Sequence, residues 1–153
     1  MDITGGAVGA LPIAVVPFAA DDAPRGHGHY LVSEDLRRSG LFDPMPESDF
    51  LTRPSNRDEV QLQNWRTLGA DNLVVGRIGR EGSQYTVRFE LIDVYTGSRI
   101  VGKRYTAEGD EMRRLAHTIS NEIFEALVGR PGAFNTRIAY VRAEGAASSG
   151  GSG

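Results

Sequence analysis

The 153-residue sequence contains no cysteine. It therefore has no disulfide framework, no thiolate metal site and no cysteine nucleophile. No apolar run approaches the roughly 20 residues that a membrane-spanning helix needs, so membrane insertion is not expected. The N-terminus also lacks the basic region, hydrophobic core and cleavage site of a secretory signal peptide. If the natural protein is exported, we expect that signal to lie outside this sequence.

An excess of positive charge is also missing. Seventeen lysines and arginines stand against twenty aspartates and glutamates, which gives a net charge of −3. The chain therefore has no general electrostatic attraction to phosphate backbones or anionic lipids, and neither nucleic acid nor a membrane is an expected partner. Its contents of 40% hydrophobic and 24% charged residues are ordinary globular values, so one self-sufficient core is expected.

Apolar runs predict the strands at the centre of the fold. Residues 13–16 form a short run fenced by prolines, which is typical of a strand buried on both faces. Residues 72–78 form a similar run, and helices between the two runs favour a parallel arrangement. Residues 84–95 alternate apolar and polar side chains, then turn into a strand over 99–106. One face of this hairpin should be buried and the other wet.

Three segments have the apolar periodicity of helices: residues 27–39, 57–68 and 110–128. The first is expected to end at Gly40, with Leu41 packing back onto the last helical turn in a Schellman motif. Asn56 and Glu59 fit a capping box at the start of the second helix. Asp110 is the expected cap of the third.

Together these elements predict an α/β domain with a mixed four- or five-stranded sheet, and with two long helices and one shorter helix packed mainly on one face. Residues 42–55 hold three prolines and contain at most a brief strand. Residues 134–141 alternate like a further strand but have no hairpin partner after them. Residues 143–153 are rich in Gly and Ser and are expected to be a flexible linker or tag.

Residues able to carry catalysis form no group that we interpret as an active site. His27 and His29 stand where the first strand leads into the first helix, a place where α/β folds bind phosphate, but the rest of a nucleotide-binding fingerprint is missing. Two imidazoles without a third ligand also make a poor metal site. The carboxylates at residues 21–22 and 108–111 are typical of an acidic loop and a helix cap. We predict no enzymatic activity, no cofactor and no metal.

Three other side chains are expected to belong to the fold and not to a binding site. Trp65 and Tyr85 lie on apolar stripes, so we expect them in the core and not on a ligand-binding surface. His117 belongs to the third predicted helix, where it should either pack or face solvent.

Several blocks of the sequence, taken together, resemble the N-terminal domain of the TolB family. They occur in the family's order and spacing from residue 2 to about residue 141, which makes the set far more specific than any single block. The blocks are DITGG at 2–6, PIAVVPF at 12–18, DLRRSGLF at 35–42, WRTLGAD at 65–71, HTISNEIF at 117–124 and GAFNTRIAYV at 132–141.

The resemblance implies a non-enzymatic interaction domain in the periplasm, part of the Tol-Pal system for outer-membrane integrity and constriction at cell division. In the family the flexible N-terminal segment engages the C-terminal domain of TolA. A β-propeller that follows the domain binds the lipoprotein Pal and some bacteriocins. Residues 131–142 correspond to the start of that propeller, so Pal and bacteriocin binding is not expected from the domain at residues 11–130.

Carried over by position, the TolA-binding box falls on Asp2, Ile3, Thr4, Gly5 and Gly6, within a flexible segment at residues 1–10. The family's box begins several residues earlier, so binding through this shorter stretch is expected to be weaker. Small mixed sheets that carry helices also occur in anticodon-binding domains. An RNA- or nucleotide-binding module is therefore the alternative hypothesis, and the acidic charge balance disfavours it.

Overall fold

A computed structural model describes residues 10–20, 27–129 and 142–144. The helices are α1 (His27–Arg38), α2 (Leu62–Leu68) and α3 (Met112–Val128), and short 3₁₀ turns cover Glu47–Asp49, Arg57–Glu59 and Gly109–Glu111. The strands are β1 (Leu11–Val15), β2 (Ala19–Ala20), β3 (Phe42–Pro44), β4 (Asn72–Glu81), β5 (Gln84–Asp93), β6 (Arg99–Glu108) and β7 (Arg142–Glu144). Within the described residues, no helix is both long and apolar enough to cross a membrane.

All the strands belong to one mixed sheet. Its order is β3-β1-β4-β5-β6-β7, and β2 pairs with β4 beside the end of β1. β1 runs parallel to β3 and β4, whereas β4, β5, β6 and β7 are joined in antiparallel pairs. The mixed sheet and the parallel relation of the first strand to residues 72–78 are therefore confirmed. The short strands β2, β3 and β7 extend the four main strands that the sequence predicts.

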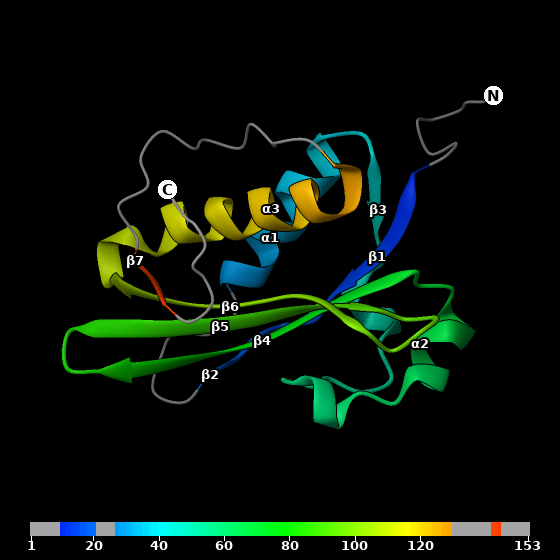
Figure 1. Ribbon diagram of the computed structural model, residues 1–153, viewed down its shortest axis with the longest axis horizontal. Helices are drawn as coiled ribbons and strands as arrows, with labels where there is room; N and C mark the ends of the chain where they lie inside the picture. The colour runs from blue at the N-terminus through cyan, green and yellow to red at the C-terminus, as the bar shows by residue number, and fades with distance from the viewer. Residues whose placement is uncertain (1–9, 21–26, 130–141, 145–153) are drawn as a thin grey trace.

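The helices occupy both faces of the sheet, with the two long ones on the same side. α1 and α3 lie side by side above the sheet and α2 lies below it (Figure 1). The larger core forms under α1 and α3 and includes Leu36, Phe89 and Ile123. The smaller core forms around Trp65 of α2 and Leu73 of β4. The predicted packing of the helices mainly on one face is confirmed.

The burial of the main strands follows from these two cores. In β1, Ile13 belongs to the larger core and Ala14 to the smaller one, so this strand is buried on both faces as expected. In β5, Val87 and Phe89 are buried beneath the long helices, whereas Arg88 between them is exposed. Around Arg88 of β5 and the neighbouring part of β6, the second sheet face therefore carries none of the described helices.

The second helix differs from its prediction at the start. The Asn56 side chain accepts a hydrogen bond from the Glu59 amide at 3.2 Å, as a cap should, but it closes only the 3₁₀ turn Arg57–Glu59. The Glu59 carboxylate does not complete the capping box, because it accepts hydrogen bonds from the backbone and side chain of Ser55. Gln61 then has an extended backbone, and α2 begins only at Leu62.

The first helix ends at the predicted place with one of the two Schellman hydrogen bonds, from the Gly40 amide to the Arg37 carbonyl at 3.1 Å. Gly40 has a φ of 80°, the left-handed conformation that glycine favours. The Leu41 amide donates to the Ser39 hydroxyl, and that hydroxyl donates to the Leu36 carbonyl. Ser39 therefore stands between the two groups that a Schellman motif would join directly. The Leu41 side chain is 37% exposed, and its apolar contact with the last helical turn stays a prediction.

The third helix is also preceded by a 3₁₀ turn. Glu108, and not Asp110 as predicted, is the capping residue, in a reciprocal capping box with Glu111. The Glu108 amide donates to the Glu111 carboxylate at 2.9 Å. The expected strand at 134–141 lies outside the described residues. Just after it, β7 pairs with β6 at positions that include the first two residues of the expected linker.

Two neighbouring substitutions on β5 test which face of the sheet is buried. Phe89→Ala should lower the free energy of unfolding by about 3 to 5 kcal/mol, because it leaves a cavity under α1 and α3. Arg88→Ala should change it by about 0.5 kcal/mol or less, because this side chain is exposed. Urea unfolding of the two variants measures both values, and equal losses would contradict the assigned faces.

Candidate interaction surfaces

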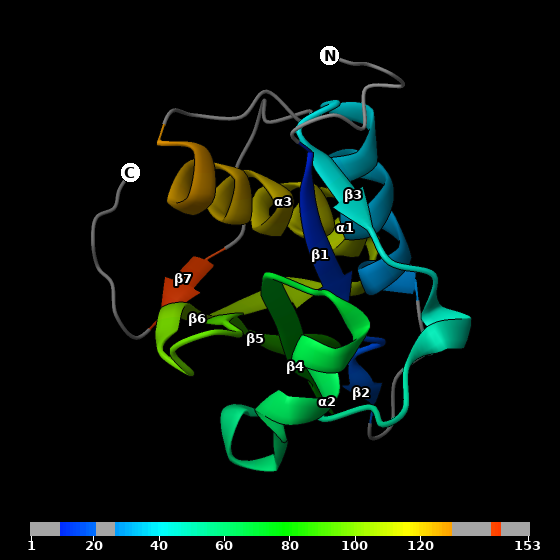
Figure 2. The same cartoon turned by 90° about the vertical axis from the view of Figure 1, so that its right-hand side faces the viewer.

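The predicted partner-binding residues, Asp2 to Gly6, lie outside the described residues. The structure does describe where the chain that follows them enters the sheet. The Leu11 amide donates to the Leu41 carbonyl at 2.9 Å, which starts the parallel pairing of β1 with β3. β1 is paired with β4 on its other side. The N-terminal segment therefore leads into a strand that has neighbours on both sides (Figure 2).

The outer edge of β3 is a poor place for a further strand. Leu41 and Met45 use their backbone groups to bond β1, so Pro44 between them directs its backbone away from β1. Proline has no amide hydrogen to donate. This edge is therefore short and blunted, as natural sheet edges often are.

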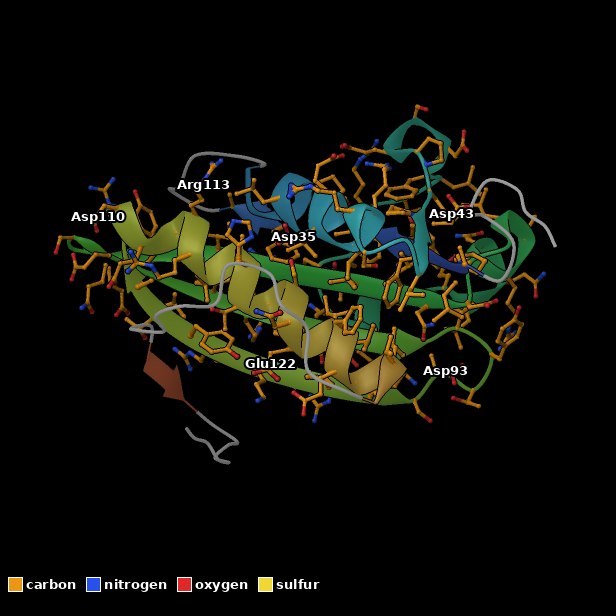
Figure 3. All side chains as sticks on the ribbon, turned by 90° about the horizontal axis from the view of Figure 1, so that it is seen from above. Asp35, Asp43, Asp93, Asp110, Arg113 and Glu122 are labelled. Carbon is orange, nitrogen blue, oxygen red and sulfur yellow. The ribbon has the colours of Figure 1, made fainter. Side chains whose placement is uncertain are left out.

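A buried polar pair joins the two long helices. The Asp35 carboxylate on α1 lies 2.6 Å from His117 Nδ1 on α3, and Figure 3 shows Asp35 between these helices. A carboxylate only accepts hydrogen bonds, so the Nδ1 proton must lie between the two groups. Arg38 adds a longer contact, 3.8 Å from Asp35. The sequence predicted neither the burial of Asp35 nor its partner.

A second polar group joins α3 to β6. The Tyr105 hydroxyl donates to the Glu122 carboxylate at 3.0 Å, and Lys103 Nζ lies 3.0 Å from the other Glu122 oxygen. Glu122 projects from α3 toward β6 (Figure 3). Burial, and then the neighbouring negative charge and hydrogen bond of Glu122, raise the pKa of Tyr105 far above its usual value. Each charge in this group has an opposite partner, so the group is suited to holding α3 on the sheet.

A groove with a volume of about 530 Å³ lies on the second sheet face, between β5 and the turn at residues 56–58. Polar and charged side chains line it: Asn56, Arg57, Asp58, Arg88, Glu90 and Arg99. Glu90 accepts a hydrogen bond from the Arg57 backbone amide at 2.9 Å. It also forms an ion pair with Arg99 at 3.3 Å. The groove is therefore rich in donors for anionic groups.

Four other residues that the sequence singles out lie in α1, α2 and β5. α1 begins at His27, so His27 and His29 both lie in its first turn. Trp65 is fully buried beside Phe50, which confirms its place in the core, although its indole nitrogen has no hydrogen-bond partner among the described residues. Tyr85 packs against the larger core and carries Arg80 over its ring. In the described ranges no group of three His, Cys, Asp or Glu residues could hold a metal ion.

A family model described as the TolB amino-terminal domain matches residues 1–100. The chain belongs to the TolB family. It is 44% identical over 147 residues to the Tol-Pal system protein TolB of Alkalilimnicola ehrlichii, a match that covers 94% of this chain and 34% of that protein. It is 43% identical over 149 residues to the TolB of Nitrosococcus oceani, which covers 96% of this chain and 34% of that protein. This TolB-family chain thus spans about a third of the curated relatives it matches.

Structural comparison agrees with the sequence. The crystal structure of TolB from Acinetobacter baumannii matches with a TM-score of 0.69 and 28% sequence identity, covering 80% of this chain and 29% of that one. The resemblance to the TolB N-terminal domain is confirmed, and the chain is the N-terminal domain of a Tol-Pal system protein. The family match includes Asp2 to Gly6, a segment whose residue types alone predict no particular structure.

Removal of the Asp35 carboxylate tests the joint between α1 and α3. Asp35→Ala should lower the free energy of unfolding by about 2 to 4 kcal/mol, because it leaves the buried His117 ring without its acceptor. Glu34→Ala is the matched control, since the neighbouring Glu34 pairs with Arg37 near the surface and its loss should cost about 0.5 kcal/mol or less. Similar losses in the two variants, measured by urea unfolding, would contradict a special role for the buried pair.

Alkaline unfolding tests the environment of Tyr105. Its pKa is raised in the folded state, so its contribution to stability is complete below the unfolded pKa of about 10 and is lost as pH rises above it. The free energy of unfolding should therefore fall less steeply above about pH 10 for Tyr105→Phe than for the parent chain. Other titrating groups are common to both proteins and cancel in the difference. Parallel pH profiles would show that the folded protein does not hold this hydroxyl in its protonated form.

Proposed function

We propose that this domain is a non-enzymatic interaction domain of a periplasmic TolB, and that it contacts the C-terminal domain of TolA through Asp2, Ile3, Thr4, Gly5 and Gly6. The observation that carries the proposal is the TolB family match, which begins at residue 1 and so includes this segment. The contact would place the chain in the system that maintains outer-membrane integrity and constricts the outer membrane at division. Pal and bacteriocins are the expected partners of the propeller that follows this domain in the family.

The way the chain enters the sheet supports one mode of contact. β1 is already paired with β3 and β4, and Pro44 blunts the outer edge of β3. A strand formed by the preceding residues would therefore add to a sheet of the partner and leave this sheet intact, which is β-augmentation. Ile3 and Thr4 are β-branched and suit such a strand.

The polar groups described above support the non-enzymatic part of the proposal. Asp35 with His117, and Glu122 with Tyr105 and Lys103, are the acid–base combinations that a search for catalysis would select. Each lies where a helix packs on its neighbour, and each is engaged by a structural partner. These polar groups therefore serve to pack and orient α1 and α3.

Titration of the ¹⁵N-labelled chain with the C-terminal domain of TolA tests the proposal. Amide signals of residues 2–8 should shift, and Ile3→Asp should weaken binding by about tenfold or more, because a charge replaces an apolar side chain in the contact. Leu51→Asp is the matched control, since Leu51 is 63% exposed and lies outside the segment. It should leave the affinity unchanged.

Two results would overturn this mode of contact. One is a set of shifts confined to α1, α2 and α3. The other is an equal loss of affinity in Ile3→Asp and Leu51→Asp, which would mean that added negative charge alone weakens binding.

A further inference from the structure

Three arginines stand in a row on the second sheet face, where Arg77 is half-buried and Arg88 and Arg104 are exposed. Arg77 of β4 is directly opposite Arg88 of β5, and Arg88 is directly opposite Arg104 of β6. Directly opposed residues in antiparallel strands point to the same side, and neighbouring strands are about 4.8 Å apart. The row therefore spans roughly 10 Å. Its side is the one opposite the buried Val87 and Phe89.

The groove described above continues this row. Arg57 and Arg99 line it together with Arg88, so five arginines gather on one part of the surface. Three carboxylates lie among them, on Asp58, Glu59 and Glu90, which leaves local charge positive although the whole chain is acidic.

Several of these guanidinium groups are held in place. Arg57 Nε donates to the Gly97 carbonyl at 2.6 Å, and Arg77 donates to the Ser55 hydroxyl at 3.2 Å. Arg99 lies across Gly102, where a Cβ would come within 3.0 Å of its side chain. Ordered arginines lose less conformational freedom when they bind an anion, so binding costs less.

We propose that the arginine row, Arg77, Arg88 and Arg104, together with the adjoining groove, is a docking site for a short acidic segment of a partner polypeptide. Charge complementarity supports this occupant. Glu90 shows the geometry within the protein itself, because its carboxylate is bound by one arginine side chain and by a backbone amide. The site goes beyond the proposed contact with TolA, which uses the N-terminal segment.

A polypeptide fits this surface better than a nucleic acid. Nucleic acid presents a dense, regular line of phosphates and needs a continuous basic surface. Here Asp58 and Glu90 interrupt the basic groups, and the chain as a whole has a net charge of −3. A short segment with two or three carboxylates can match the arginines and avoid the interruptions.

An NMR titration of the ¹⁵N-labelled chain with a hexaglutamate peptide at low ionic strength tests the proposal. Amide shifts should map to β4, β5 and β6 around the arginine row. Arg88→Gln should weaken binding roughly threefold, the effect of one exposed charge pair. Arg113→Gln is the matched control, because Arg113 is also exposed but lies on α3, on the other side of the sheet. It should leave the affinity unchanged.

Hexathymidylate, titrated under the same conditions, separates the two classes of anion. Weaker binding of hexathymidylate than of hexaglutamate at the arginine row supports the proposal. Tighter binding of hexathymidylate there would overturn it in favour of a nucleic-acid surface. The proposal also fails if hexaglutamate shifts amides elsewhere, or if Arg88→Gln and Arg113→Gln weaken binding equally. Circular dichroism of both variants shows that the fold is retained.

Discussion

The structure depends on the central position of β4. This strand receives parallel partners, β1 and β2, along one edge and the antiparallel β5 along the other. Its residues feed both cores, with Val74 under the long helices and Leu73 against α2. The parallel and antiparallel halves of the sheet therefore meet on one strand, and neither core could form without it.

Gly76 makes this meeting possible. A Cβ at this position would lie 2.6 Å from the Arg88 carbonyl and 3.0 Å from the Phe18 ring. Glycine is needed here for close approach, not for an unusual backbone conformation. The Phe18 ring can thus lie directly on β4, between the end of β1 and the start of β2. Residues 19 and 20 then continue beside β4 as β2.

The sequence was sufficient for those parts of the fold whose signal is local. Periodicity identified α3 and β5, and the apolar run with its prolines identified the buried strand β1. The start of α2 was missed because Glu59 bonds Ser55 and the chain stays extended through Gln61, which is a competition among side chains that periodicity does not register. The burial of Asp35 was missed because its partner, His117, lies far away in the sequence.

Local sequence signals identified neither of the two candidate interaction surfaces. Asp2 to Gly6 were identified by family resemblance alone, since nothing in their residue types distinguishes them from an ordinary flexible lead-in. The arginine row could not be found from the sequence, because Arg77, Arg88 and Arg104 become neighbours only through the register of β4, β5 and β6. Charge counts over the whole chain pointed away from such a surface.

The joint between α1 and α3 also determines the order of folding. Asp35 and His117 are 82 residues apart, and the apolar face of α1, with Val32 and Leu36, belongs to a core that α3 completes together with β1 and β3. A chain that emerges from its N-terminus must therefore keep the part of this face that meets α3 unburied until nearly the whole domain is available. Contacts of such long range slow folding and extend the time during which apolar surface is open to aggregation. The domain should thus acquire its structure late and in one cooperative step, after α3 has been added.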